Sequence, residues 1–163
     1  MLQFDLSPLV GARLGERLVF SLDEGPQRLE DISVVFLRGG LTFTRIQEGI
    51  LVEGEVETQI EVECARCLVP FPFGASLELE EIIAINEQAE TTFSLTDEGW
   101  FELSPLLREQ AWVALPISLV CSEDCRGLCP SCGSDLNEGQ CDCRQEQIDP
   151  RLAALASLLT EDQ

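Results

Sequence analysis

Residues 52–64, with the sequence VEGEVETQIEVEC, decide the fold of this 163-residue chain. Apolar or small side chains occupy every second position of the stretch, and glutamate or glutamine occupies the positions between them. Side chains of a β-strand alternate between the two faces of a sheet with a period of two. The stretch therefore predicts a long, half-buried antiparallel strand with one apolar face and one acidic, solvated face.

Shorter patterns on both sides of this strand predict further strands. Residues 32–37 are apolar and rich in β-branched side chains, residues 41–46 alternate, and a pair of glycines between them indicates a break. A third alternating pattern runs over residues 71–85. We therefore expect a β-rich body that covers residues 1–85.

The second half of the chain changes in character. Residues 86–99 are polar and acidic and predict a loop, whereas residues 100–116 predict a helix that starts with Ser104 as N-cap before a proline. Residues 117–146 contain six cysteines and little periodicity, which is typical of a segment organised by metal. Residues 149–160 repeat the cap-then-proline signal, and leucines at helical spacing predict an amphipathic C-terminal helix.

These patterns together predict one domain of the α+β class over residues 1–163. The expected architecture is a curved antiparallel sheet or partial barrel with one central helix, a zinc-organised cysteine-rich segment and a C-terminal helix. No stretch is apolar for long enough to cross a membrane, and the first 20 residues do not have the order of features of a signal peptide. We therefore expect a cytoplasmic protein with no membrane partner.

Charge and composition exclude several classes of function. The net charge is −20, and the chain has no histidine. Without histidine, a Ser–His or Cys–His nucleophile pair cannot form within one subunit, and a transition-metal site has to use cysteine or carboxylate ligands. An acidic surface repels phosphate backbones and attracts basic partners. We therefore expect no enzymatic activity and no small-molecule substrate, although the charge is also explained by solubility alone.

The eight cysteines are sufficient for two tetrahedral four-thiolate sites, and we expect two Zn²⁺ ions. One expected site, the long-range group, joins the turn between two strands to the cysteine-rich segment. The other, the local group, contains a C-x2-C knuckle followed by Gly133, which suits a turn with positive φ. The long-range group is Cys64, Cys67, Cys121 and Cys125, and the local group is Cys129, Cys132, Cys141 and Cys143.

Other uses of these cysteines are chemically possible. Partners among Cys121, Cys125, Cys129 and Cys132 could be exchanged between the two sites. A disulfide framework requires a secreted chain, and neither C-x2-C pair opens a helix after a strand as a thioredoxin-like redox pair does. An iron–sulfur cluster also uses four thiolates. Metal binding is the reading that suits an intracellular chain best.

The sequence resembles the YceD family, whose members are called large ribosomal RNA subunit accumulation proteins. Five segments carry the resemblance, which extends over about residues 30–160: VECARCL (62–68), LPI (115–117), CSEDCRGLCPSCGSDLNE (121–138), CDC (141–143) and DPRLAALASLL (149–159). The resemblance implies a role in accumulation or processing of 23S rRNA and in assembly of the large ribosomal subunit, in bacteria or chloroplasts. It also implies that the long-range group is shared across the family and that the local group is optional.

Two hypotheses follow for the molecular activity; a third, an enzyme such as a nuclease that uses carboxylate-bound Mg²⁺, has no recognisable motif in the sequence. In the first, the chain is a zinc-stabilised acidic protein that binds a basic large-subunit ribosomal protein or a pre-ribosomal particle. In the second, it binds 23S rRNA directly through a local basic patch. The arginines of that patch would be Arg66, Arg126, Arg144 and Arg151.

Overall fold

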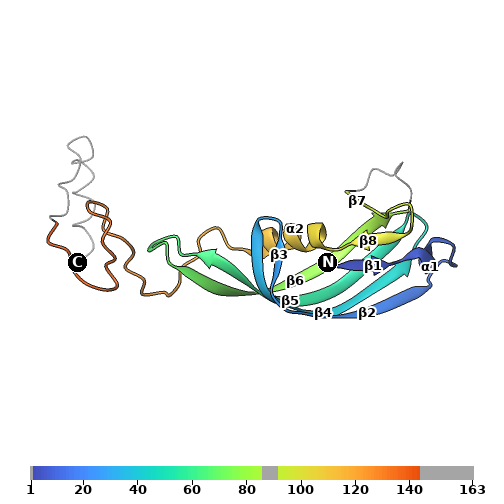
Figure 1. Ribbon diagram of the computed structural model, residues 1–163, viewed down its shortest axis with the longest axis horizontal. Helices are drawn as coiled ribbons and strands as arrows, with labels where there is room; N and C mark the ends of the chain where they lie inside the picture. Colours follow the sequence, from blue (N-terminus) through green and yellow to red (C-terminus); the bar gives the residue numbers. More distant parts are fainter. Residues whose placement is uncertain (1, 86–91, 144–163) are drawn as a thin grey trace, which may run out of the picture.

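A curved six-stranded sheet forms the body of the molecule (Figure 1). The computed structural model describes residues 2–85 and 92–143. The C-terminal helix predicted over residues 149–160 lies outside the described residues, as do residues 86–91 of the predicted acidic loop. The described elements are β1 (Gln3–Asp5), α1 (Ser7–Val10), β2 (Arg17–Glu24), β3 (Gln27–Leu29), β4 (Ile32–Arg45), β5 (Ile50–Glu63), β6 (Pro70–Ala84), β7 (Phe93–Ser94), β8 (Trp100–Glu102) and α2 (Ser104–Ala114).

The long strand predicted from the alternating stretch is β5, at the centre of the sheet. The order of strands is β2-β4-β5-β6-β7, with β3 paired to one end of β4, and every pair is antiparallel except β6 with β7. Val52, Val56 and Ile60 are buried, and the glutamates between them are exposed. The prediction of one apolar and one acidic face is confirmed. In the described part of the chain, the sheet has two open edges and does not close into a barrel.

The predicted break after residue 37 is wrong, because β4 is continuous from Ile32 to Arg45. A side chain at Gly39 would collide with the backbone oxygen of Glu55 on β5, and one at Gly54 would collide with the backbone oxygen of Gly40. These glycines therefore allow two neighbouring strands to approach closely where the sheet curves, instead of ending a strand. An irregular register between Val34 and Leu37 adds to the curvature.

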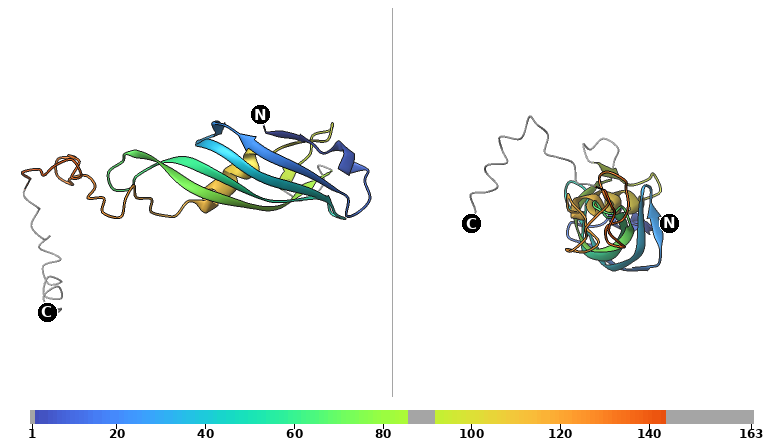
Figure 2. Two further views of the ribbon diagram at one scale, coloured as in Figure 1. Left: turned by 90° about the horizontal axis from the view of Figure 1, so that it is seen from below. Right: turned by 90° about the vertical axis from the view of Figure 1, so that its left-hand side faces the viewer.

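One helix covers the concave face of the sheet, as Figures 1 and 2 show. α2 buries Leu106, Leu107 and Ala111 against the sheet and ends at Ala114, two residues before a proline. The predicted helix over residues 100–116 was too long, since residues 100–102 form β8 and pair with β1. Leu103, not Ser104, is the N-cap. No helix among the described residues has the length and apolar character needed to span a membrane.

Two side chains of α2 fasten it to the turn between β3 and β4. Arg108 donates from Nε and Nη2 to the two carboxylate oxygens of Asp31 at 2.5 and 3.1 Å, and its Nε lies 3.3 Å from Glu30. These contacts hold the pKa of Asp31 below its ordinary value, with a further contribution from the Trp112 indole. These contacts therefore fix the position of α2 on the sheet.

Aromatic packing fills the end of the core that lies farthest from the cysteines. Phe43 is fully buried, and its ring centroid lies 5.7 Å from those of Phe4 and Phe20 and 6.2 Å from that of Phe101. These distances lie in the range of favourable edge-to-face and tilted aromatic pairs. The short strands β1 and β8 are anchored on the sheet by this cluster.

Candidate metal centres

The cysteines gather at one end of the elongated molecule: two lie in the turn of the β5–β6 hairpin, and the other six lie in the segment that follows α2 and extends past this turn (Figure 1). Figure 2 shows the chain leaving α2 and looping along this end. Residues 117–143 form no helix or strand and contain a single isolated bridge, between Leu128 and Asp135. A segment with so little regular structure needs another source of order, and the cysteines are suited to supply it.

The long-range group brings together cysteines from two distant parts of the chain. The four sulfur atoms of Cys64, Cys67, Cys121 and Cys125 all lie within 4.8 Å of one another. The Cys64–Cys125 and Cys67–Cys121 Sγ–Sγ distances are 3.8 and 3.7 Å. A tetrahedron of thiolates at a zinc–sulfur distance of about 2.3 Å has edges of about 3.8 Å. The geometry therefore suits one tetrahedral ion and is too long for the bond of about 2.05 Å in a disulfide.

Backbone amides support this group from both segments. Leu68 has a φ of 61°, and its N–H donates to the Cys64 carbonyl at 2.9 Å, which closes the tight turn after β5. The amides of Arg66 and Cys121 point at the Cys64 sulfur, each at 3.4 Å. The Ala65 amide donates to the Leu119 carbonyl at 2.7 Å and so draws the second segment onto the hairpin.

Arg66 joins the two halves of the long-range group. Its guanidinium donates to the carbonyls of Cys125 and Glu123 at 2.9 and 3.3 Å, and its own carbonyl accepts from the Leu128 amide at 3.0 Å. Gly127 has a φ of 73°, and a Cβ there would lie 2.8 Å from the Arg66 carbonyl oxygen. Arg66 thus bridges protein groups, a use that differs from its predicted place in a phosphate-binding patch.

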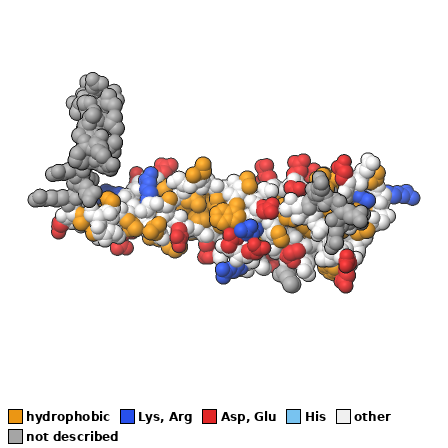
Figure 3. Space-filling view, turned by 90° about the horizontal axis from the view of Figure 1, so that it is seen from above, with side chains coloured by type: hydrophobic (Ala, Val, Ile, Leu, Met, Phe, Trp, Pro, Cys, Tyr) orange, Lys and Arg blue, Asp and Glu red, His pale blue; other side chains and the backbone are white. Residues whose placement is uncertain are grey.

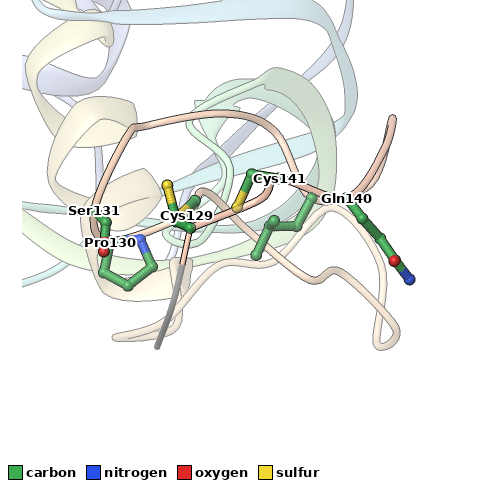
Figure 4. A pocket seen from close by; sticks show the side chains of 7 residues that line it. Cys129, Pro130, Ser131, Gln140 and Cys141 are labelled. Carbon is green, nitrogen blue, oxygen red and sulfur yellow. The ribbon is translucent and has the colours of Figure 1, made fainter. Parts of the chain in front are cut away.

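The local group closes within the cysteine-rich segment. The sulfurs of Cys129, Cys132, Cys141 and Cys143 all lie within 4.8 Å of one another. Gly133 has the positive φ expected of the knuckle, 72°, and donates its amide to the Cys129 carbonyl at 2.8 Å. Figure 4 shows Cys129 and Cys141 among the residues that line a cavity of about 250 Å³. Cys132 and Cys143 are exposed, so this group is more open to solvent than the long-range group.

Hydrogen bonding and crowding give the thiols of each group very different acidities. Burial raises the pKa of Cys64, but the backbone amides of Cys121, Cys67 and Arg66 outweigh it and bring that pKa to about 6. The backbone amide of Val69 lowers the pKa of Cys67, but burial and the neighbouring cysteines raise it to about 12. Four thiolates so close together repel one another, and a divalent cation removes that repulsion.

The same contrast appears in the local group. The Ser134 hydroxyl and amide bring the pKa of Cys132 to about 6, and the Ser134 oxygen lies 3.1 Å from that sulfur. Cys132 itself, together with burial, raises the pKa of Cys143 to about 12. One thiol of each group ionises readily and another resists ionisation until a cation is bound.

The structure groups the eight cysteines in the four-plus-four division that the sequence favoured, and it records all eight as free thiols. Soft thiolate ligands in a tetrahedron are those that zinc prefers, so the residues fit the predicted ions. Of the other predicted residues, Arg126 is exposed and donates its backbone amide to Asn137 at 2.8 Å. Arg144 and Arg151 lie outside the described residues.

Sequence reasoning missed Asn137, which contacts a cysteine of the long-range group. Its side-chain oxygen accepts from the Arg126 amide, and its Nδ2 lies 3.6 Å from the Cys125 sulfur and 2.7 Å from Asp135. A side-chain amide of this kind supports a metal ligand without binding the metal. Only the spacing of Asn137 after the knuckle could have drawn attention to it.

Comparison with known proteins identifies relatives over most of the chain. An uncharacterised protein of Mycobacterium tuberculosis is 34% identical over 154 residues, which are 91% of this chain and 69% of that protein. The uncharacterised protein YlbN of Bacillus subtilis is 24% identical over 111 residues, 66% of this chain and 64% of that protein.

The chloroplastic large ribosomal RNA subunit accumulation protein YCED homolog 1 of Arabidopsis thaliana is 32% identical over 57 residues, 35% of this chain and 18% of that protein. No solved structure matches the chain. The family model described as large ribosomal RNA subunit accumulation protein YceD matches residues 52–159, a range that contains most of β5, all of β6 and α2, and both cysteine groups. The chain belongs to the YceD family.

Proposed function

We propose that this protein is a ribosome biogenesis factor that promotes accumulation and processing of 23S rRNA and assembly of the large subunit. It acts as a zinc-stabilised acidic protein that binds a basic large-subunit ribosomal protein or the pre-ribosomal particle. The observation that carries the proposal is the family match over residues 52–159, which includes all eight cysteines. Its place of action is the cytoplasm, or the chloroplast stroma for an organellar member.

The acidic face of the sheet supports a cationic partner. Glu53 of β5 lies directly opposite Glu80 of β6, and Glu55 lies opposite Glu78. All four side chains are exposed. Like charges in facing positions destabilise a sheet, so these two pairs carry an electrostatic cost. A partner rich in lysine and arginine would relieve the repulsion and would be attracted over a long range by the net charge of −20.

The metal ions in this proposal have a structural role. Four thiolates complete a tetrahedral zinc site and leave no position for water or substrate, unlike the open sites of zinc enzymes. The chain's own residues hold the ions: the β5–β6 turn and residues 121–125 supply one set of thiolates, and residues 129–143 supply the other. Together with the lack of histidine, this supports a binding protein and not an enzyme.

Affinity capture from a bacterial lysate in increasing salt tests the proposal. The expected result is recovery of a basic ribosomal protein or of large-subunit precursors, with a yield that falls steeply as salt rises. The variant E53Q/E55Q should capture less than the wild type, whereas E24Q/E48Q, which removes the same charge from exposed positions elsewhere, should capture as much. Capture that is insensitive to salt and to E53Q/E55Q would contradict the proposal.

Direct rRNA binding is the alternative, and its basic patch has little support among the described residues. Arg66 and Arg126 are both exposed, but the guanidinium of Arg66 is held by two backbone carbonyls, so Arg126 can be substituted without breaking those contacts. A gel shift with a 23S rRNA fragment separates the two possibilities. Tight binding of naked RNA that Arg126→Gln abolishes would favour the alternative.

A further inference from the structure

A groove lies beside the C-terminal end of α2, where β4 separates from β5. Its volume is about 410 Å³. Three acidic residues, Asp31, Glu61 and Glu63, contribute to its lining. The apolar residues that line it are Ile32, Ile60, Val62, Trp112, Leu115 and Leu119.

We propose that this groove binds a short extended segment of a basic protein, with an apolar side chain seated in the groove and lysine or arginine beside Glu61 and Glu63. The proposal rests on the proposed function and deepens it, since it assigns a surface and a kind of segment to the basic partner.

The apolar character of the surface extends beyond the groove. Trp112 is 52% exposed, Val113 is 79% exposed, and Ile117 is fully exposed. Figure 3, which faces the side on which α2 lies, shows apolar side chains gathered in the middle of the molecule with charged side chains beside them. Contiguous exposed apolar side chains with a polar rim mark an interaction site.

The backbone at the groove is an open strand edge. Pairing of β4 with β5 ends at Val34 and Ile60, whereas pairing of β5 with β6 continues to Glu63 and Pro70. Residues 61–63 therefore pair on one side only within the described part of the chain. A strand edge of this kind presents amides and carbonyls to an incoming segment, and pockets beside it select alternate side chains. A peptide segment in an extended conformation can both pair with this strand edge and place alternate side chains in the groove.

Charge identifies the occupant. Asp31 is already paired with Arg108, but Glu61 and Glu63 are exposed and form no ion pair with any described residue. Two free carboxylates beside an apolar groove match a segment in which basic and apolar side chains alternate. A second copy of this chain would bring another net charge of −20 to the same place and is therefore disfavoured.

A fluorescence titration tests the groove. The probe is a short fluorescein-labelled peptide in which lysine alternates with valine, and peptides with serine for valine or glutamate for lysine are the controls. We expect the first peptide to bind and the other two to bind at least about tenfold more weakly, because one lacks the apolar anchor and the other has the wrong charge. Equal binding of the serine peptide would overturn the proposal.

Matched variants locate the binding. Trp112→Ala should weaken binding about tenfold, and Trp112→Phe should retain most of it, because an aromatic anchor remains. E61Q/E63Q should weaken binding about three- to tenfold at low salt. Trp100→Ala, at another exposed tryptophan, and E24Q/E48Q should bind within about twofold of the wild type. The thermal stability and metal content of each variant are measured as well, so that weaker binding caused by loss of the fold is recognised.

The outcomes separate this proposal from the function on which it rests. If wild type and Trp112→Ala bind the peptide and capture ribosomal protein equally well, the groove proposal fails and the function stands. If the wild type captures no ribosomal component yet binds the peptide through Trp112, the function fails and the groove stands. A dimer in solution that Trp112→Ala dissociates would make a second copy the occupant and overturn the proposal.

Discussion

Replacing Cys64 with serine should release one metal ion and lower the stability of the whole sheet. Cys64 is fully buried at the end of β5, and its sulfur receives two backbone amides in addition to lying against Cys125. Serine cannot supply a thiolate, so the long-range group loses a ligand. The cysteine-rich segment is then no longer fastened to the hairpin through a metal.

The size of the effect follows from the loop that the metal closes. Cys67 and Cys121 are 54 positions apart. A cross-link that closes a loop of roughly 50 residues is worth about 4 kcal/mol in the chain-entropy treatment. At about 3 °C per kcal/mol for a chain of this size, losing this link should lower Tm by roughly 10 °C.

Circular dichroism melting and metal analysis of the same samples provide the measurement. Cys132→Ser is the matched control, because it breaks the local group, which closes only a short loop and fastens no strand. Each variant should bind one metal ion fewer than the wild type, but Cys132→Ser should lower the Tm of the sheet by less than about 4 °C, because the local group links no strand. Equal shifts for the two variants, or full metal content in Cys64→Ser, would refute the reasoning.

Three further predictions concern packing and thiol reactivity. Gly54→Ala should cost at least about 2 kcal/mol in urea unfolding, because its Cβ meets a backbone oxygen of β4, whereas Gly74→Ala on β6 meets nothing within 4 Å and should change stability by less than about 0.5 kcal/mol. Phe43→Ala should cost about 3–5 kcal/mol through the cavity it leaves at the centre of the aromatic cluster, and Val19→Ala, 73% exposed, should be nearly neutral in the same assay. In chelator-treated protein, alkylation of Cys132 by iodoacetamide should rise as pH passes upward through about 6, because the reactive thiolate forms there; a rate that begins to rise only above pH 8 would contradict this.

The strands were predictable where apolar and polar side chains alternate over many residues. The alternation in β5 persists over the full stretch from Val52 to Cys64, and a shift of one position would bury every glutamate, so only one register is possible. β7 and β8, of two and three residues, are too short to show any period. Gly39 was misread because a glycine that ends a strand and a glycine that admits a close neighbour look alike until the neighbour is known.

The cysteine groups were predictable because residue type limits the chemistry. With no histidine and eight thiols, spacing alone favoured the division that the structure shows. The supporting residues were not predictable in the same way. The role of Arg66 depends on the carbonyls of Glu123 and Cys125, and that of Asn137 depends on a turn around the knuckle. Such partners are set by the folded backbone, and no local pattern in the sequence encodes them.

The long-range group and the groove share a wall, so metal binding and partner binding should be linked. Leu119 lines the groove, and its carbonyl accepts from the Ala65 amide at 2.7 Å, between Cys64 and Cys67. Without the ion, Leu119 is no longer held at the groove. The affinity for the lysine–valine peptide should then fall at least about threefold, because part of the binding free energy is used to order this side of the groove again. Cys132→Ser, which leaves the long-range group intact, should bind the peptide as the wild type does. Equal affinity before and after chelation would show that the groove is held by α2 and β5 alone.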